Sequence, residues 1–439
     1  MTTFSPEATR AIDLVNNTDT NVFITGKAGT GKSTLLEHIR LHSKKNLIVL
    51  APTGVSAVHV HGDTIHSFFT LKPGYEKDEA MSMRIDEKKA SKYKRIKTIA
   101  IDEISMVRAD LLDAVDIVLR RARKDDRAFG GVQMIFFGDL YQLPPVVTPS
   151  DHQKFYAEYP SPYFFDAQVF NAQTDLFGNG LTFETVELST IYRQQDTTFI
   201  DVLNAVRDNT VTAAHLATLN ARLDEAFTPK KKEKYMYLMT TNASAQVIND
   251  ARLGDIWSVE KTFTADITGD VPRNLYPNDT SITLKVGAQV MFVNNEPERQ
   301  WVNGTIGTVK KIEEVYSEEK KKKEPVITIE TSDGMRKVRP HTWEISKYMF
   351  QGKEFVREVM GSFTQLPVKL AWAITIHKSQ GKTFEKVILD LGRGAFAHGQ
   401  TYVALSRCTS LEGLVLKKPI TKRSIIMDER VREFTNGKK

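Results

Sequence analysis

The sequence has few of the features that mark secreted or membrane proteins. It holds a single cysteine, Cys408, among 439 residues, which excludes an internal disulfide and a zinc site built from cysteines. It contains no run of about 20 apolar residues, the length that crosses a bilayer. Its first residues, MTTFSPEATR, lack the charged and then apolar layout of a secretion signal. We therefore expect a cytoplasmic protein with no membrane partner.

Length and charge set broad limits on the class of protein. A chain of 439 residues is too long for one ordinary core, so two or three domains are expected. The composition, 41% hydrophobic and 26% charged, is typical of a globular protein. There are 60 Lys and Arg against 54 Asp and Glu, a net charge of +6 that leans mildly toward polyanions without proving a partner.

The stretch ITGKAGTGKSTL, residues 24–35, places three glycines close together. Glycine weakens a core, so this spacing indicates that the backbone itself approaches a ligand. The stretch matches G-x-x-x-x-G-K-[ST] between an apolar run and a helix-like run, an arrangement that points backbone N–H groups at a phosphate. Lys32 adds a positive charge and is predicted to be catalytic, and the Ser33 hydroxyl is a candidate ligand of Mg²⁺. The predicted nucleotide-binding residues here are Gly26, Ala28, Gly29, Thr30, Gly31, Lys32, Ser33 and Thr34.

Residues 21–150 repeat an order of short apolar strand, polar loop and helix. The strands are NVFITG, NLIVLAPTG, TIAIDEIS and VQMIFFGDL. Runs that are apolar on both faces and alternate with helices predict a parallel sheet covered on both sides. Ligands bind beyond the carboxyl ends of such strands, where the polar motifs of this chain lie. The order is interrupted at about 70–97 by a basic run, RIDEKKASKYKRIK, for which a solvated helix is the simple alternative.

The second half of the chain changes character twice. The α/β order resumes near residue 180, gives way to short alternating strands between about 256 and 365, and returns at about 366. Turn pairs such as Asn303-Gly304 and Asp333-Gly334 separate the short strands, as in a small β-barrel. We predict a first lobe at 1–179, a second lobe at 180–255 and 366–439, and a barrel at 256–365 inserted in the second lobe.

Two adjacent acids, Asp102 and Glu103, end the strand TIAIDEIS. Neighbouring carboxylates repel each other unless a cation or a water network uses them. This placement favours Asp102 as a ligand of Mg²⁺ and Glu103 as the catalytic residue that orients the attacking water. An ordinary surface pair of acids is the alternative.

Three further side chains suit a γ-phosphate. Gln142, in FFGDLYQLPPV, can sense the phosphate through a neutral hydrogen bond, although an ordinary proline-stopped loop is the alternative. Arg193 in STIYRQ and Arg407 in QTYVALSRC can stabilise the negative charge that develops during hydrolysis if they are delivered from a second lobe. A salt bridge or surface contact is the alternative for either arginine alone.

An ordered set of motifs then carries a family resemblance over nearly the whole chain: GKAGTGKST, APTGVSAVHVHGDTIHSFF, IDEISM, FGGVQMIFFGDLYQLPPV, IYRQ, LAWAITIHKSQGKT and YVALSR. The set resembles the PIF family of superfamily-one DNA helicases, whose motors run 5′ to 3′, and more weakly the RecD and phage Dda helicases. The resemblance implies an α/β fold of two RecA-like P-loop lobes that clamp ATP and Mg²⁺. It further implies a short wedge at about 70–97 in the first lobe and a small SH3-like barrel in the second.

The same resemblance suggests partners and further site residues. Single-stranded DNA would cross both lobes, tailed or forked duplex DNA would be unwound, and a monomer of prokaryotic or phage origin is expected. Gly381 joins Gln142, Arg193 and Arg407 in the nucleotide-binding set. Family members usually carry a glutamine near the N-terminus that reads adenine, whereas Ala8 stands at that place, so other nucleoside triphosphates stay open as substrates.

Candidate DNA contacts follow strand ends in both lobes. Hydroxyls and amides suit phosphates and flat rings suit bases, although the core is the simple alternative for the two phenylalanines. The predicted contacts are Pro52, Thr53, Gly54, Ser56, His66, Phe68 and Phe69 in the first lobe and, by resemblance, His377, Lys378 and Ser379 in the second.

Two other functions share parts of this pattern. A nucleotide-gated clamp on single strands, or a remodelling ATPase without processive unwinding, would use nearly all the same residues. A small-molecule phosphotransferase would use the phosphate loop but would have no use for Arg193 and Arg407 in a second lobe.

Overall fold

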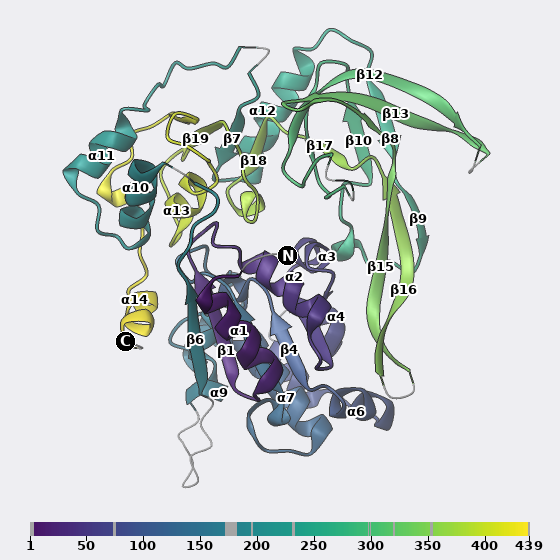
Figure 1. The fold of residues 1–439 in the computed structure, drawn as a ribbon, viewed down its shortest axis with the longest axis vertical. Coiled ribbons are helices and arrows are strands. Elements are labelled where there is room, and N and C mark those ends of the chain that lie inside the picture. Colours follow the sequence, from purple (N-terminus) through teal and green to yellow (C-terminus); the bar gives the residue numbers. More distant parts are fainter. Residues whose placement is uncertain are drawn as a thin grey trace. The chain divides into compact units, whose positions relative to one another are not determined.

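The computed structural model describes residues 4–72, 76–171, 182–194, 196–230, 233–296, 298, 300–318, 321–351 and 354–437 (Figure 1). These residues belong to two compact units. Unit 1 comprises Met1–Tyr192, Ser346–Val359 and Asp428–Lys439, and unit 2 comprises Arg193–Ile345 and Met360–Met427. Within the described ranges, no helix has the length and apolar character needed to cross a membrane.

Unit 1 is built on a six-stranded parallel sheet with the order β3-β2-β4-β5-β1-β6. The strands are β1 (Asn21–Gly26), β2 (Leu47–Ala51), β3 (Asp63–Thr64), β4 (Thr98–Ile101), β5 (Gln133–Phe137) and β6 (Phe183–Leu188). The helices are α1 (Pro6–Asn17), α2 (Lys32–His42), α3 (Gly54–His59), α4 (Ile65–Phe69), α5 (Glu76–Ser82), α6 (Glu87–Lys94), α7 (Ala109–Arg123), α8 (His152–Glu158), α9 (Gln168–Asn171) and α14 (Glu429–Asn436), with 3₁₀ turns η1 (Ile104–Met106), η2 (Ala128–Gly131) and η3 (Phe164–Asp166).

Both faces of this sheet are buried. Val22 and Ile24 of β1 pack in a core with α1 and α2, whereas Phe23 between them packs in a second core with α7. Alternate side chains of a strand point to opposite faces, so a strand covered on both sides, such as β1, is mostly apolar, whereas the edge strand β6 exposes Thr185 and Glu187. The predicted parallel sheet with both faces covered is confirmed.

The predicted wedge contains the short helices α5 and α6, and its residues 73–75 lie outside the described residues. Arginines of α7 hold both helices by their carbonyl ends: Arg123 donates to the carbonyls of Tyr93, Lys94 and Ile96, and Arg121 donates to that of Met83. These bonds satisfy carbonyl groups that a helix end leaves without intrahelical partners.

The last helix, α14, packs in unit 1, whereas residues 366–439 were predicted to belong to the second lobe. Arg430 binds both carboxylate oxygens of the buried Asp166 at 2.5 and 2.8 Å. The Phe434 ring stacks on Phe165 with 4.0 Å between centroids, and Val431 is fully buried. These contacts join positions more than 260 residues apart, so local sequence patterns could not predict them.

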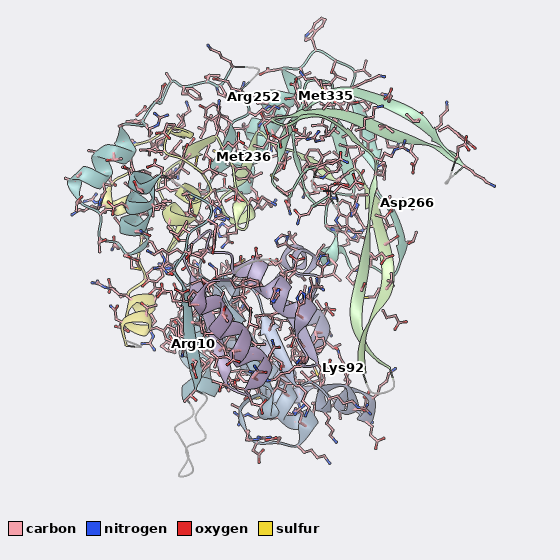
Figure 2. All side chains as sticks on the ribbon, viewed as in Figure 1. Arg10, Lys92, Met236, Arg252, Asp266 and Met335 are labelled. Atoms are coloured by element: carbon pink, nitrogen blue, oxygen red, sulfur yellow. The ribbon has the colours of Figure 1, made fainter. Side chains whose placement is uncertain are left out.

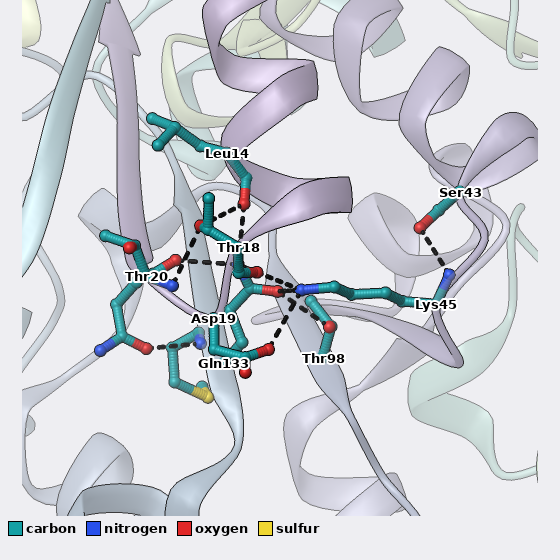
Figure 3. A network of polar contacts seen from close by, with 10 residues as sticks. Leu14, Thr18, Asp19, Thr20, Ser43, Lys45, Thr98 and Gln133 are labelled. Carbon is teal, nitrogen blue, oxygen red and sulfur yellow. Dashed lines mark hydrogen bonds and ion pairs between the residues drawn. The ribbon is translucent and has the colours of Figure 1, made fainter.

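A network of polar contacts lies at the amino ends of the unit 1 strands (Figure 3). The buried Gln133 amide donates to the carbonyls of Leu14, Thr18 and Thr20 at 2.8–3.2 Å. Its oxygen accepts from Lys45 at 2.8 Å and from Thr98 at 3.0 Å. One side chain thereby joins the end of α1 to β4 and β5.

Unit 2 contains a four-stranded parallel sheet with the order β18-β7-β19-β20. Its strands are β7 (Met236–Met239), which begins at the residue labelled Met236 in Figure 2, β18 (Ala373–Thr375), β19 (Val387–Asp390) and β20 (Leu414–Leu416). The helical elements are α10 (Thr197–Arg207), α11 (Ala213–Asn220), α12 (Asn242–Gly254), α13 (Gln400–Leu405), η5 (His377–Ser379) and η6 (Lys422–Ser424). With the unit 1 sheet, this completes the predicted pair of parallel α/β sheets.

Antiparallel strands occupy the predicted barrel region. A five-stranded sheet has the order β14-β13-β12-β11-β17, and β10-β8 and β15-β16-β9 form two smaller sheets. The bounds are β8 (Lys261–Thr264), β9 (Asp266–Gly269), η4 (Arg273–Leu275), β10 (Ser281–Leu284), β11 (Gln289–Phe292), β12 (Ile306–Ser317), β13 (Lys322–Thr331), β14 (Gly334–Val338), β15 (His341–Gln351), β16 (Glu354–Gln365) and β17 (Val368–Leu370). One apolar core joins β10, β11 and β17. The description of this region as an SH3-like barrel stays a prediction.

Candidate nucleotide and DNA site

The phosphate loop joins β1 to α2 as predicted, and its backbone requires glycine at two positions. Gly26 has φ +151°, and a Cβ atom there would lie 2.7 Å from the carbonyl oxygen of Leu188. Gly31 has φ +83° and caps the amino end of α2 in the left-handed conformation. Both positions exclude larger residues, because a side chain would clash at the first and strain the second.

Lys32 folds over this loop at the first position of α2. Its Nζ donates to the carbonyls of Gly26 at 2.6 Å and Lys27 at 3.0 Å, and the Thr30 hydroxyl also donates to Lys27 at 2.9 Å. Ser33 and Thr34 follow on the exposed first turn. Helix N–H groups without intrahelical partners lie in this turn, so the loop can hold an anion.

The two predicted acids follow β4. Burial of Asp102, together with the neighbouring Glu103 charge, raises the pKa of Asp102 to about 7, and Lys32 opposes the rise. Glu103 has φ +48° and ψ +46°, the left-handed conformation that is strained for a residue with a side chain. A buried carboxyl beside a second acid suits a divalent cation, whose charge would favour the ionised form of Asp102.

Gln142 lies in the loop after β5 and is 6% exposed. Its Nε2 lies 3.4 Å from Oδ2 of Asp139, whose other carboxylate oxygen accepts from the backbone N–H of Tyr141 at 3.2 Å. The Tyr141 hydroxyl contacts that of Thr435 in α14 at 2.9 Å. Contacts within the loop, made by Asp139, and a contact with α14, made by Tyr141, therefore hold the loop that carries Gln142.

The two predicted arginines belong to unit 2, where one backbone segment joins them. Arg193 donates to the carbonyl of Ser406 at 3.3 Å. Arg407 is 1% exposed, and its guanidinium donates to the Val403 carbonyl at 3.0 Å and the Ser406 hydroxyl at 2.9 Å. Both side chains thus contact the turn that follows α13.

Four of the seven predicted DNA contacts in unit 1 lie at the start of α3. The Thr53 side chain caps this helix, accepting from the Ser56 N–H at 3.2 Å, and the two hydroxyls are 2.8 Å apart. Pro52, Gly54 and, in the next short helix, His66 are partly exposed.

Phe68 and Phe69 do not offer their rings to a base, which corrects the prediction for both. They are 1% and 0% exposed and belong to the core beside α7. Lys92 of α6, labelled in Figure 2, lies 3.9 Å above the Phe68 ring, and Tyr93 stacks on Phe69 with 5.4 Å between centroids. Helix α6 of the predicted wedge covers these rings. The alternative for these two residues, that they belong to the core, is therefore the correct one.

In unit 2 the predicted contacts fall on and beside η5. Lys378 is exposed, and His377 is partly buried, which lowers its pKa. Ser379 is fully buried and its hydroxyl donates to the Ile376 carbonyl at 2.7 Å, so its side chain does not offer a hydroxyl to DNA here. Gly381 has φ +75°, and apart from its chain neighbours none of the described residues lies within 4 Å of the place a Cβ atom would take.

Comparison with known proteins places this geometry in a family. Residues 5–216 match the family described as PIF1-like helicase. The chain is 33% identical to the ATP-dependent DNA helicase Pif1 of Bdellovibrio bacteriovorus, over 98% of this chain and 91% of that protein. It is 36% identical to Bacteroides sp Pif1 solved in complex with ADP-AlF4, with a TM-score of 0.89 over 100% of this chain and 97% of that one. With Bacteroides Pif1 bound to ssDNA, the TM-score is 0.68 at the same identity and coverage.

The chain belongs to the PIF1-like helicase family. The predicted family, the α/β fold with two parallel sheets and the class of ATP-dependent DNA helicase are thereby confirmed.

Two residues that the sequence motifs did not single out lie beside the predicted site residues of this PIF1-like helicase. Tyr192 is 64% exposed, its N–H donates to the Gly29 carbonyl at 2.9 Å, and its ring would lie 3.8 Å from a Cβ atom at Gly31. Asp139 organises the Gln142 loop. Both lie inside motifs that were singled out for a neighbouring residue. For Tyr192, the available signal was an aromatic residue directly before Arg193.

Proposed function

We propose that this chain is a cytoplasmic, monomeric motor that hydrolyses Mg²⁺-ATP to move 5′ to 3′ along single-stranded DNA and to unwind tailed or forked duplexes. The observation that carries the proposal is the joint geometry of Lys32, Asp102 and Glu103 at the strand ends of unit 1. The direction of travel rests on the family.

In the nucleotide site, the loop N–H groups and Lys32 would bind the phosphates. The Ser33 hydroxyl and the Asp102 carboxylate fit a Mg²⁺ ion, which supplies charge neutralisation to the phosphate oxygens when bound. Glu103 would orient the attacking water and accept its proton, and Gln142 would contact the γ-phosphate.

Arg193 and Arg407 would stabilise the charge that develops on the transferred phosphoryl group. A guanidinium offers several donors in a fixed plane, and charge-directed donors of this kind are usually the largest contribution to such catalysis. Because both arginines contact the same turn, they would enter and leave the site together, which would couple hydrolysis to movement.

The base of the nucleotide would stack on Tyr192, whose exposed ring lies beside the phosphate loop. Stacking is tolerant of base identity because every base has a flat face. Ala8 is 6% exposed in α1 and offers no side-chain amide. We therefore expect turnover of several nucleoside triphosphates.

On the DNA side, Pro52, Thr53, Gly54, Ser56 and His66 of unit 1 and His377 and Lys378 of unit 2 are the remaining candidates for backbone contacts. Phosphate contacts position a strand without reading its sequence. Alternating grip by the two units during the ATP cycle would then give directional steps.

The deciding experiment is strand displacement from duplexes that carry a single-stranded tail on either the 5′ or the 3′ side. We expect ATP-dependent displacement from the 5′-tailed duplex alone. Lys32→Ala is the inert control, because it loses the charge that holds the phosphates. ATP-dependent strand binding without displacement would replace the motor with a nucleotide-gated clamp, and displacement from the 3′ tail alone would reverse the proposed direction.

A further inference from the structure

The side chain after Arg193 holds the backbone on both sides of Arg407. Gln194 is 3% exposed, and its Nε2 donates to the carbonyls of Ser406 and Cys408, each at 3.0 Å. A side-chain amide carries two N–H donors, and two acceptors share this one nitrogen. The carbonyl between them, that of Arg407, accepts from the Phe384 N–H at 2.9 Å. Three consecutive carbonyls are therefore fixed around one arginine.

These carbonyls need such donors because of their place in the fold. They follow directly after α13, which ends at Leu405, so no further helical turn supplies N–H partners for them. The segment is buried, with Ser406 and Arg407 each 1% exposed, so bulk water is a poor substitute donor. Arg193 donates to Ser406 as well, but at a longer 3.3 Å. Gln194 is the short-range donor to both carbonyls that flank Arg407.

We propose that Gln194 is a positioning residue for ATP hydrolysis, setting the backbone from which Arg407 reaches the phosphoryl group. The inference rests on the proposed function of Arg407. Loss of the amide removes this donor from two buried carbonyls, and the turn shifts so that other donors can reach them. A shift of about 1 Å in a catalytic group can lower the rate by up to about 100-fold. Gln194 belongs to unit 2 and the phosphate loop to unit 1, so we expect ATP binding to be retained.

The test is Gln194→Met, which keeps the length of the side chain and removes both donors. We expect the kcat of DNA-stimulated ATP hydrolysis to fall by about 10-fold or more, with the KM for ATP and the affinity for a single-stranded oligonucleotide within about 2-fold. Should Gln194→Met fail to fold, Gln194→Asn keeps the amide on a shorter stem and supports the same measurements.

A matched control separates positioning from simple stability. Gln289 of β11 is 6% exposed, and its amide donates to two carbonyls, those of Tyr235 and Ala371, each at 2.7 Å. Gln289→Met should lower the melting temperature by a similar amount and leave kcat unchanged. Equal losses of kcat in the two variants would overturn the inference, because any broken amide bridge would then have the same effect.

A double-mutant cycle with Arg407→Ala decides through which residue Gln194 acts. If Gln194 works by placing Arg407, Gln194→Met lowers kcat no further once Arg407 is gone. Additive losses would overturn the inference. An unchanged kcat in Arg407→Ala alone would instead refute the proposed role of Arg407, and an unchanged kcat in Gln194→Met beside a defective Arg407→Ala would refute only the positioning role.

Discussion

The polar side chains at the two ends of the unit 1 sheet are placed differently: they are hydrogen-bonded at one end and strained or perturbed at the other. At the amino ends of the strands, Gln133 satisfies the carbonyls at the end of α1 and accepts from Lys45 and Thr98 (Figure 3). At the carboxyl ends, Glu103 is held in a strained left-handed conformation and the pKa of Asp102 is raised toward neutrality.

The difference shows that groups that stabilise the fold and groups suited to chemistry lie at opposite ends of the same strands. Polar groups at the amino ends have partners that explain them structurally. The acids at the carboxyl ends lower stability in the absence of ligand, and strained or perturbed groups of this kind cluster at functional sites. Substitutions at the two ends should therefore affect different measurements.

The largest expected effect is on turnover. Glu103→Gln keeps the shape of the side chain but removes its ability to accept a proton from water. We expect the kcat of ATP hydrolysis to fall by about 100-fold or more, with ATP binding retained. Steady-state hydrolysis and nucleotide titration check the two halves of this expectation, and normal turnover would remove Glu103 from the proposed chemistry.

At the opposite end, Gln133→Leu should affect stability alone. It leaves the Lys45 amine, the Thr98 hydroxyl and several carbonyls without their present partner, which predicts a loss of about 3 kcal/mol in the free energy of unfolding. Denaturant unfolding measures the loss, and kcat should be unchanged at a temperature where both proteins are folded.

Asp19→Ala is the matched control for that variant, because the fully exposed Asp19 carboxylate contacts the same Lys45 at 3.3 Å. An exposed ion pair contributes little, so we expect a change below about 0.5 kcal/mol. Equal losses in the two variants, or a defect in kcat for Gln133→Leu, would contradict the separation of the two ends.

The raised pKa of Asp102 gives a pH dependence with a definite sign. An acid whose pKa rises from 3.8 to about 7 on folding binds more protons in the folded than in the unfolded state between these values. It therefore lowers stability progressively as the pH rises from about 4 to 7. Asp102→Asn should gain stability relative to the parent over that interval, with the difference levelling off above it.

Unfolding curves at several pH values measure this difference. Glu103→Gln should remove only part of the pH dependence, because burial, the main cause of the raised pKa, remains. A stability difference between Asp102→Asn and the parent that does not change between pH 4 and 7 would show that the carboxyl is ionised throughout.

The carboxyl ends could be predicted from the sequence because their signals are local. Glycine spacing, a Lys-Ser pair and two adjacent acids each follow a recognisable strand within a few positions. The Gln133 network could not be predicted, since its partners lie up to 119 positions away. The burial of Phe68 and Phe69 was open only as an alternative, because the side chains that cover them come from the inserted helix α6.

The smallest expected change in the free energy of unfolding gives the most direct test of this comparison. Glu103→Gly relieves the left-handed conformation and the repulsion with Asp102, so we expect a gain of about 1 kcal/mol in the free energy of unfolding together with loss of hydrolysis. Lys124→Gly is the matched control: this exposed residue ends α7 at φ +55° and ψ +46°, nearly the same conformation, and has no assigned chemistry. Its substitution should give a similar gain with normal turnover. If Glu103→Gly is instead less stable than the parent, the Glu103 side chain contributes more to the fold than its conformation costs, and the carboxyl end of the sheet is not where stability is reduced for function.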